Sequence, residues 1–168
     1  AAYQRAATDS ASGNGKTINA YHDYGIQFAP EMVDGLTVGY ATGELHESTT
    51  ESIDHSTYFI KYAYGNFTVA YQDHEADGTS AASSDESETW GVSYAVNEDF
   101  TIAYGERDYD DNTSSAAAGS LEQNDSGFSA SYTTGGMTIA AHFNSNDNVG
   151  GVATADRDAY EIALTFAF

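Results

Sequence analysis

The sequence predicts an all-β protein whose antiparallel strands cross a membrane as an up-and-down β-barrel. Three observations carry this prediction. The C-terminal segment alternates strictly between large apolar and small or polar side chains, and about nine to ten segments of the chain share that alternation. Short and long polar connections also alternate between these segments, as turns and loops do on the two sides of a transmembrane barrel.

The C-terminal segment shows the alternation most clearly. Successive side chains of a strand point to opposite faces. Here one face is small or polar, and the other is wholly apolar and carries Tyr160, Ile162, Leu164, Phe166 and Phe168. Because aromatic rings prefer the two interfaces of a membrane, this pattern predicts a strand that faces lipid.

A short phrase of an aliphatic residue, a small residue and tyrosine recurs along the chain. It lies in the segments Leu36–Gly43, Phe67–Gln72 and Phe100–Gly105, with weaker copies at Ala1–Tyr3 and Ile139–Ala141. Between these segments lie others with the same alternation, which begin at Tyr24, Tyr58, Trp90, Phe128 and Tyr160. The spacing of roughly 30–40 residues suits one β-hairpin per repeat.

The connections predict which strand ends share a side of the membrane. Four are short and contain glycine, proline, asparagine or acidic residues, which favour tight turns, at 30–35, 65–66, 97–99 and 135–136. The others are longer and polar, at 8–16, 46–55, 75–85, 109–124 and 145–156. The piece at 1–7 is then expected to be the upper end of an ascending strand.

Composition limits the class of protein. The 168 residues suit a single domain, and no apolar run is long enough for a transmembrane helix. The 26 acidic against 5 basic residues, a net charge of −21, argue against a nucleic-acid partner. The absence of cysteine excludes a disulfide framework, and 13 Tyr with 8 Phe exclude a disordered acidic chain.

A soluble antiparallel sandwich would also alternate. Its inner face would be rich in Val, Ile and Leu, whereas the apolar face here is rich in tyrosine and the opposite face holds Thr, Ser, Gly and Ala. This favours lipid on one side and water on the other. The apolar band covers only about seven residues of most strands, shorter than the roughly 9–11 expected of a membrane-spanning strand.

Polar residues on the small-residue face are candidates for the lining of a water-filled lumen, because a charge at mid-strand is costly against lipid. They are Asp23, Gln27, Lys61, Gln72, His74, Arg107, His142 and Glu161. Lys61 and Arg107 could form a basic wall across from acidic groups. Solvation of the wall, or a place for Arg107 at the rim, would explain them equally well.

Three acidic clusters are expected in the loops: Asp73, Glu75 and Asp77; Asp85, Glu86 and Glu88; and Asp108, Asp110 and Asp111. The weak candidates for a Ca²⁺ site are Asp108, Asp110 and Asp111, since hard cations prefer several oxygen ligands. They lack an EF-hand pattern, and a solvated, negatively charged vestibule is the simpler interpretation. The sequence contains no recognisable catalytic motif, although His46 and His74 with nearby acids could serve a barrel that is an enzyme at its rim.

Two segments resemble the general porins of alphaproteobacteria: Gly-Asn-Phe-Thr-Val-Ala-Tyr at 65–71 and Tyr-Glu-Ile-Ala-Leu-Thr-Phe-Ala-Phe at 160–168. The resemblance implies a trimeric, sixteen-stranded outer-membrane porin, of which this chain would be the C-terminal half, beginning inside the seventh strand and lacking the constriction loop. It also implies that the alternating C-terminal residues through Phe168 are the signal read by the barrel-assembly machinery, and that lipid and lipopolysaccharide surround the barrel.

The leading hypothesis is therefore an outer-membrane porin without enzymatic activity or a required cofactor, passing small hydrophilic solutes and ions by diffusion. Two alternatives remain open. One is a small, complete outer-membrane barrel acting as a rim enzyme or adhesin, and the other is a soluble, acidic, calcium-binding β-protein.

Overall fold

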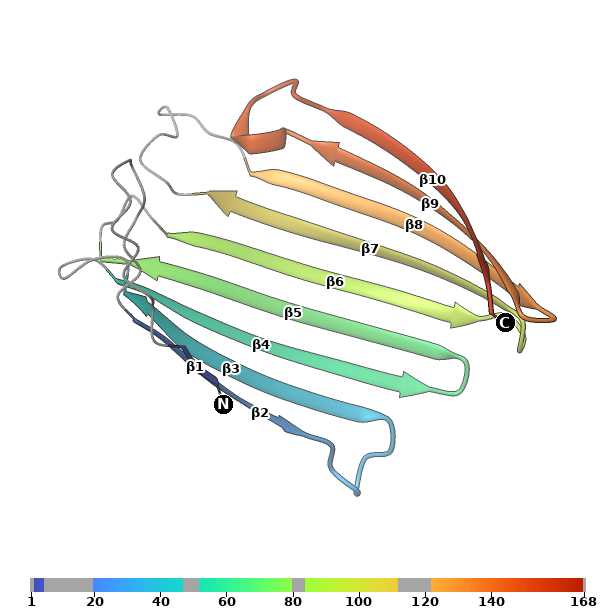
Figure 1. Ribbon diagram of the computed structural model, residues 1–168, viewed down its shortest axis with the longest axis horizontal. Coiled ribbons are helices and arrows are strands. Elements are labelled where there is room, and N and C mark those ends of the chain that lie inside the picture. The colour runs from blue at the N-terminus through green and yellow to red at the C-terminus, as the bar shows by residue number, and fades with distance from the viewer. Residues whose placement is uncertain (1, 5–19, 47–51, 80–83, 112–121, 168) are drawn as a thin grey trace.

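The computed structural model describes residues 2–4, 20–46, 52–79, 84–111 and 122–167. They form one antiparallel sheet in which ten strands pair in sequence order (Figure 1). The strands are β1 (Ala2–Gln4), β2 (Ala20–Phe28), β3 (Leu36–His46), β4 (Ser52–Tyr64), β5 (Phe67–Gly78), β6 (Asp85–Ala95), β7 (Phe100–Asp111), β8 (Gln123–Thr134), β9 (Met137–Asp147) and β10 (Arg157–Phe166). The predicted all-β, up-and-down architecture is confirmed.

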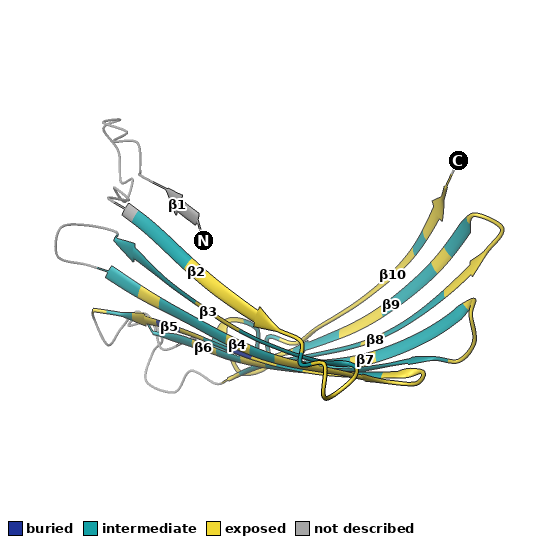
Figure 2. Ribbon diagram, turned by 90° about the horizontal axis from the view of Figure 1, so that it is seen from below, coloured by how far each residue is buried: buried dark blue, intermediate teal, exposed yellow. Residues whose placement is uncertain are grey.

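The sheet curves strongly about an axis that follows the strands. Figure 2 shows a trough with β2 and β10 toward its two rims and β4 to β7 along its floor. The three residues of β1 pair with residues 21–23 of β2, close to the long-connection end, where the sequence placed the fragment at 1–7.

The alternation of the sequence divides the sheet into two faces, and the register keeps the division in phase across the strands. Ile60 of β4, for example, lies opposite Val38 and Tyr71, while its neighbour Lys61 lies opposite Thr37 and Ala70. We call the face of Ile60 the apolar face and the face of Lys61 the polar face. A slip by one residue would exchange the two faces along a whole strand, so the pattern fixes the parity of the pairing.

Glycine makes the short connections tight. Gly135 and Gly136 join β8 to β9 with φ angles of 56° and 82°, a left-handed backbone that glycine adopts without steric cost. Gly65 has the same φ of 56° between β4 and β5. The four short connections lie at one end of the sheet, as the sequence predicts (Figure 1).

The long connections are shorter than predicted because the strands continue into them. The segments 46–55, 75–85 and 109–124 were expected to be loops, yet β4 begins at Ser52, β5 runs to Gly78 and β7 runs to Asp111. Most of the strands contain 10 to 13 residues as a result, enough to cross a membrane at a tilt. The short apolar band is therefore part of longer strands, which also carry polar ends.

In a 3₁₀ turn at Val149–Gly151, the N–H of Gly150 donates to Oε1 of Gln123, so the connection before β10 is held against β8. The described residues include no helix that is long and apolar enough to span a membrane.

Candidate functional site

The polar face carries all the side chains that the sequence marks as candidate lumen residues. By strand register they share the parity of Lys61, and they are Asp23, Gln27, Lys61, Gln72, His74, Arg107, His142 and Glu161. That this face lines a lumen remains a prediction. The structure nevertheless separates these residues into distinct local environments along the sheet.

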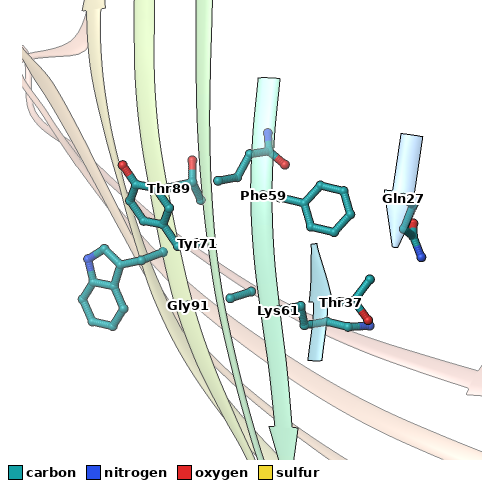
Figure 3. A pocket seen from close by; sticks show the side chains of 10 residues that line it. Gln27, Thr37, Phe59, Lys61, Tyr71, Thr89 and Gly91 are labelled. Atoms are coloured by element: carbon teal, nitrogen blue, oxygen red, sulfur yellow. The ribbon is translucent and has the colours of Figure 1, made fainter. Parts of the chain in front are cut away.

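The first environment is a cavity of about 500 Å³ on the polar face (Figure 3). Its lining includes side chains of Gln27, Thr37, Phe59, Lys61, Gln72 and Thr89, which come from β2 to β6. Five neighbouring strands can contribute to one cavity because the face is concave. The cavity brings together three of the predicted lumen residues, namely Gln27, Lys61 and Gln72.

Phe59 is the aromatic side chain in this cavity that sequence reasoning missed. Its strand neighbours Tyr58 and Ile60 belong to the apolar face, so Phe59 is an apolar exception on the polar face. The missed signal is Gly39, which pairs with it on β3. A Cβ atom built on Gly39 would lie 2.1 Å from Cε1 of Phe59, so the ring occupies the space that a side chain would fill.

The second environment is a cavity of about 360 Å³ nearer the long connections. Its lining includes Tyr21, Asp23, His55, Thr57 and His74. The imidazoles of His55 and His74 stack with centroids 5.8 Å apart, and Nδ1 of His74 lies 2.7 Å from Oγ1 of Thr57. His55 lies beyond the apolar band, and its pKa is lowered by burial and then by the neighbouring His74, despite the opposing effect of Asp54 and Asp85. Burial and the neighbouring His74 therefore favour the neutral imidazole of His55.

In the third environment, Asp125 neutralises the charge of the Arg107 guanidinium group. Its Nε donates to Oδ2 of Asp125 at 2.9 Å, and its Nη2 donates to the same oxygen. Asp125 also accepts from Nδ2 of Asn146 at 2.6 Å and from Nε2 of Gln123 at 2.9 Å. Lys61 lies on β4 and Arg107 on β7, with β5 and β6 between them, so the two are not direct neighbours, and a shared basic wall remains a prediction.

Asp125 lies beyond the apolar band, on the long-connection side of Phe128. Burial alone would raise the pKa of its carboxyl group, but the hydrogen bonds from Asn146, Gln123 and Arg107, together with the charge of Arg107, hold that pKa below its usual value. The sequence did not single out Asp125, because it follows a segment that was expected to be a loop. Opposite charges at paired positions of β7 and β8 are the signal that could have found it.

Tyrosine and tryptophan on the apolar face mark its boundary with the polar strand ends. The hydroxyl of Tyr71 donates to Glu88 at 2.7 Å, and Nε1 of Trp90 donates to Glu106 at 3.2 Å. Tyr104 also donates to Glu106. Rings with an apolar body and a polar tip are suited to such a boundary. These three side chains therefore mark where, along the strands, the apolar face ends and polar side chains begin.

Below this boundary the apolar face is exposed. Ile60 and Val69 are 45% and 46% exposed, and the alternating residues of β10 are more so: Tyr160 82%, Ile162 74%, Leu164 55% and Phe166 52%. These four belong to the predicted assembly signal, and their common face is confirmed by the register. The fifth, Phe168, lies outside the described residues.

Beyond the boundary, the apolar face becomes acidic. Asp73, Glu88 and Asp108 pair in one row across β5, β6 and β7, and Glu75, Glu86 and Asp110 pair in the next. We call these six residues the acidic belt. They were expected in loops near the mouth, and that placement is wrong, because the strands extend through them and they share the parity of the apolar face.

Like charges at paired positions repel each other. Burial raises the pKa of the Glu86 carboxyl, and the charges of Glu75, Asp73, Glu88 and Asp110 raise it further. Asp108 accepts a hydrogen bond of 2.7 Å from Nδ2 of Asn124. In the described part of the chain, no group of three or more His, Cys, Asp or Glu side chains is arranged to hold a metal ion. The side chain of Asp111 lies outside that part, and calcium binding remains a prediction.

The residues considered for a rim enzyme are not brought together. His46 lies 3.2 Å from Glu44, which also faces His22, all three on the apolar face of β2 and β3. His74 lies on the polar face of β5 with Thr57 as its partner. These histidines therefore cannot act on one substrate from their present positions.

Comparisons with known proteins give few matches. No family model matches the chain, and no curated protein matches it in sequence. Among solved structures, the chain is similar to two engineered variants of the porin of Rhodobacter blastica. One is 11% identical over 89% of this chain and 81% of that one, with a TM-score of 0.35. The other is 11% identical over 88% of this chain and 80% of that one, with a TM-score of 0.34.

Proposed function

We propose that this chain forms part of the wall of a water-filled channel in the bacterial outer membrane. Small hydrophilic solutes and ions diffuse passively through this channel. The observation that carries the proposal is the contrast between the two faces of one curved sheet. A continuous band of large apolar side chains is exposed on one face, and polar side chains line cavities on the other.

Lipid is the partner that suits the apolar face. An exposed apolar patch of this extent marks a protein or membrane interface. A second protein layer would not require the polar tips of Tyr71, Trp90 and Tyr104 to point toward one end of the strands. A membrane interface does, because aromatic rings accumulate where hydrocarbon meets the polar headgroups.

Water is the partner that suits the polar face. Lys61 lies between Ile60 and Tyr62 of the apolar band and shares a cavity with Gln27 and Gln72, and exposure of the lysine alone to hydrocarbon would cost about 2–4 kcal/mol. A channel lumen solvates all three. Assembly as a homotrimer, contact with lipopolysaccharide and folding by the barrel-assembly machinery belong to the same proposal.

Reconstitution of the native protein into planar lipid bilayers tests the proposal. We expect stepwise increases of conductance that scale with the salt concentration, and swelling of liposomes in isotonic solutions of small sugars. Insertion into lipid without conductance would contradict the channel, and failure to enter lipid would contradict the membrane placement. The rim-enzyme alternative has no support from the arrangement of His46 and His74.

A further inference from the structure

The cavity around Phe59 combines three kinds of chemistry that are separate elsewhere on the polar face. It contains the ring of Phe59, the ammonium group of Lys61 and the amides or hydroxyls of Gln27, Gln72, Thr37 and Thr89, and it is also bordered by Tyr71 and Trp90, which belong to the apolar face by register. None of the described residues lines it with a carboxylate, although the chain carries a net charge of −21. The cavity is therefore a local cationic site with a hydrogen-bonding rim and one apolar surface.

The backbone is shaped to hold the ring in place. Gly39 leaves room for Phe59 to lie across β3, and Figure 3 shows the ring reaching from β4 toward Gln27 on β2. Lys61 lies beside Thr37 on the same side of the sheet (Figure 3). The described residues provide no ion-pair partner for Lys61, whereas Arg107 is neutralised by Asp125. Among these two basic residues, only Lys61 has a charge available to a solute.

We propose that this cavity is a binding subsite for hydroxylated ring monocarboxylates, of which a hexuronate is the simplest. The proposal rests on the proposed channel function and names the solute class that the channel wall retains. The volume of about 500 Å³ lies within the range of about 300–1,000 Å³ that is typical of small-molecule sites.

Each part of such a solute has a partner in the cavity. The carboxylate faces the ammonium of Lys61 in a charge-assisted contact. The C–H face of the sugar ring is apolar and removes area from water when it lies on Phe59. The ring hydroxyls meet the amides of Gln27 and Gln72, which both donate and accept hydrogen bonds. A neutral sugar lacks the first of these contacts, and an aromatic carboxylate lacks the last.

The test measures the block of ion current through the native protein in planar bilayers at 0.1 M KCl. Glucuronate is compared with glucose and with benzoate, and we expect it to reduce the current at the lowest concentration of the three. Lys61→Gln should raise the half-blocking concentration of glucuronate about threefold to fivefold, as expected for an exposed ion pair. Arg157→Gln is the matched control, because it removes a cation from the same face at the far rim of the sheet and should change nothing.

Two further variants test the ring by independent routes. Phe59→Leu removes the aromatic surface. Gly39→Ala leaves every solute-contacting side chain intact, but its new methyl group takes the position of the Phe59 ring and displaces it. Both should weaken the block by glucuronate and also the weaker block by glucose, because both sugars place a C–H face on the Phe59 ring.

A channel that conducts ions but is blocked equally by glucuronate and glucose would overturn the subsite and leave the channel intact. So would a stronger block by benzoate, or an equal loss in Lys61→Gln and Arg157→Gln. An absence of conductance in the wild-type protein would instead overturn the channel itself. The two failures are therefore distinguishable in one experiment.

Discussion

A pair of adjacent substitutions on β6 tests the assignment of the two faces. Val92 lies on the apolar face between Val69 and Tyr104, and Ser93 lies on the polar face between Thr68 and Ala103. The two positions share a strand and almost the same depth. Arginine at either position adds the same side chain, so a difference between the variants reports the surroundings of each face.

The expected magnitude follows from the position of Val92 between Trp90 and Tyr94, near the middle of the apolar band. Arginine facing the centre of a bilayer costs about 2–4 kcal/mol. Val92→Arg should therefore lower the equilibrium constant for folding into lipid by about 30-fold to nearly 1,000-fold. Ser93→Arg places the guanidinium group in water and should cost less than about 0.5 kcal/mol.

Urea titration of the protein in phospholipid vesicles measures both values, with heat-modifiable gel migration as the readout of the folded barrel. Each titration must be shown to be reversible, since only then does the midpoint report a free energy. Equal losses in the two variants would refute the lipid-facing assignment, and a greater loss in Ser93→Arg would reverse it.

Four further outcomes are expected. Trp90, the single tryptophan, should be quenched more by lipids brominated near the headgroups than by lipids brominated at the chain ends, because its indole donates to Glu106 at the boundary of the apolar face; the reverse order would contradict this depth. Asp125→Asn should reduce the free energy of unfolding by about 1–2 kcal/mol, which is low in the range for charge-assisted hydrogen bonds because Arg107 is half exposed. The pKa of Asp125 is lowered in the folded state, so the difference from wild type in urea titrations should be full above about pH 4. This difference should disappear as the pH falls through the lowered pKa. Deletion of Phe168 should lower the yield of folded protein in the outer membrane, whereas an unchanged yield would contradict its role in assembly. Reversal potentials under a KCl gradient should show cation selectivity at 0.1 M that weakens at 1 M, as the Debye length falls from about 10 Å to about 3 Å, and anion selectivity at 0.1 M would contradict it.

The division into two faces could be predicted from the sequence because it depends only on parity. Lys61 and Ile60 are adjacent in the chain, so one is on the polar face whenever the other is on the apolar face. Strand ends were less predictable. The acidic residues from Asp108 onward have the composition of a loop, yet they continue β7 because backbone hydrogen bonds to neighbouring strands outweigh their low strand propensity.

Contacts between strands were the least predictable part of the candidate site. The position of Phe59 over Gly39 depends on the register of β3 with β4, which no local pattern fixes to the residue. The contact of Asp125 with Arg107 depends on the register of β7 with β8 in the same way, although Arg107 was recognised as a residue of the polar face. A pair of opposite charges, or of a large and a small side chain, can be recognised only after the two strands have been aligned.

The acidic belt gives the sheet the behaviour of a polyelectrolyte at one end. Two successive rows hold carboxylates face to face across β5, β6 and β7, and the strand residues on that face include no Lys or Arg among those that the structure describes. Backbone hydrogen bonds pull these strand ends together while the side chains push them apart. Dissolved salt shortens the range of that repulsion, so the pairing of the strand ends tightens as salinity rises. At low ionic strength the same ends would fray first, and this end of the sheet would be its least rigid part.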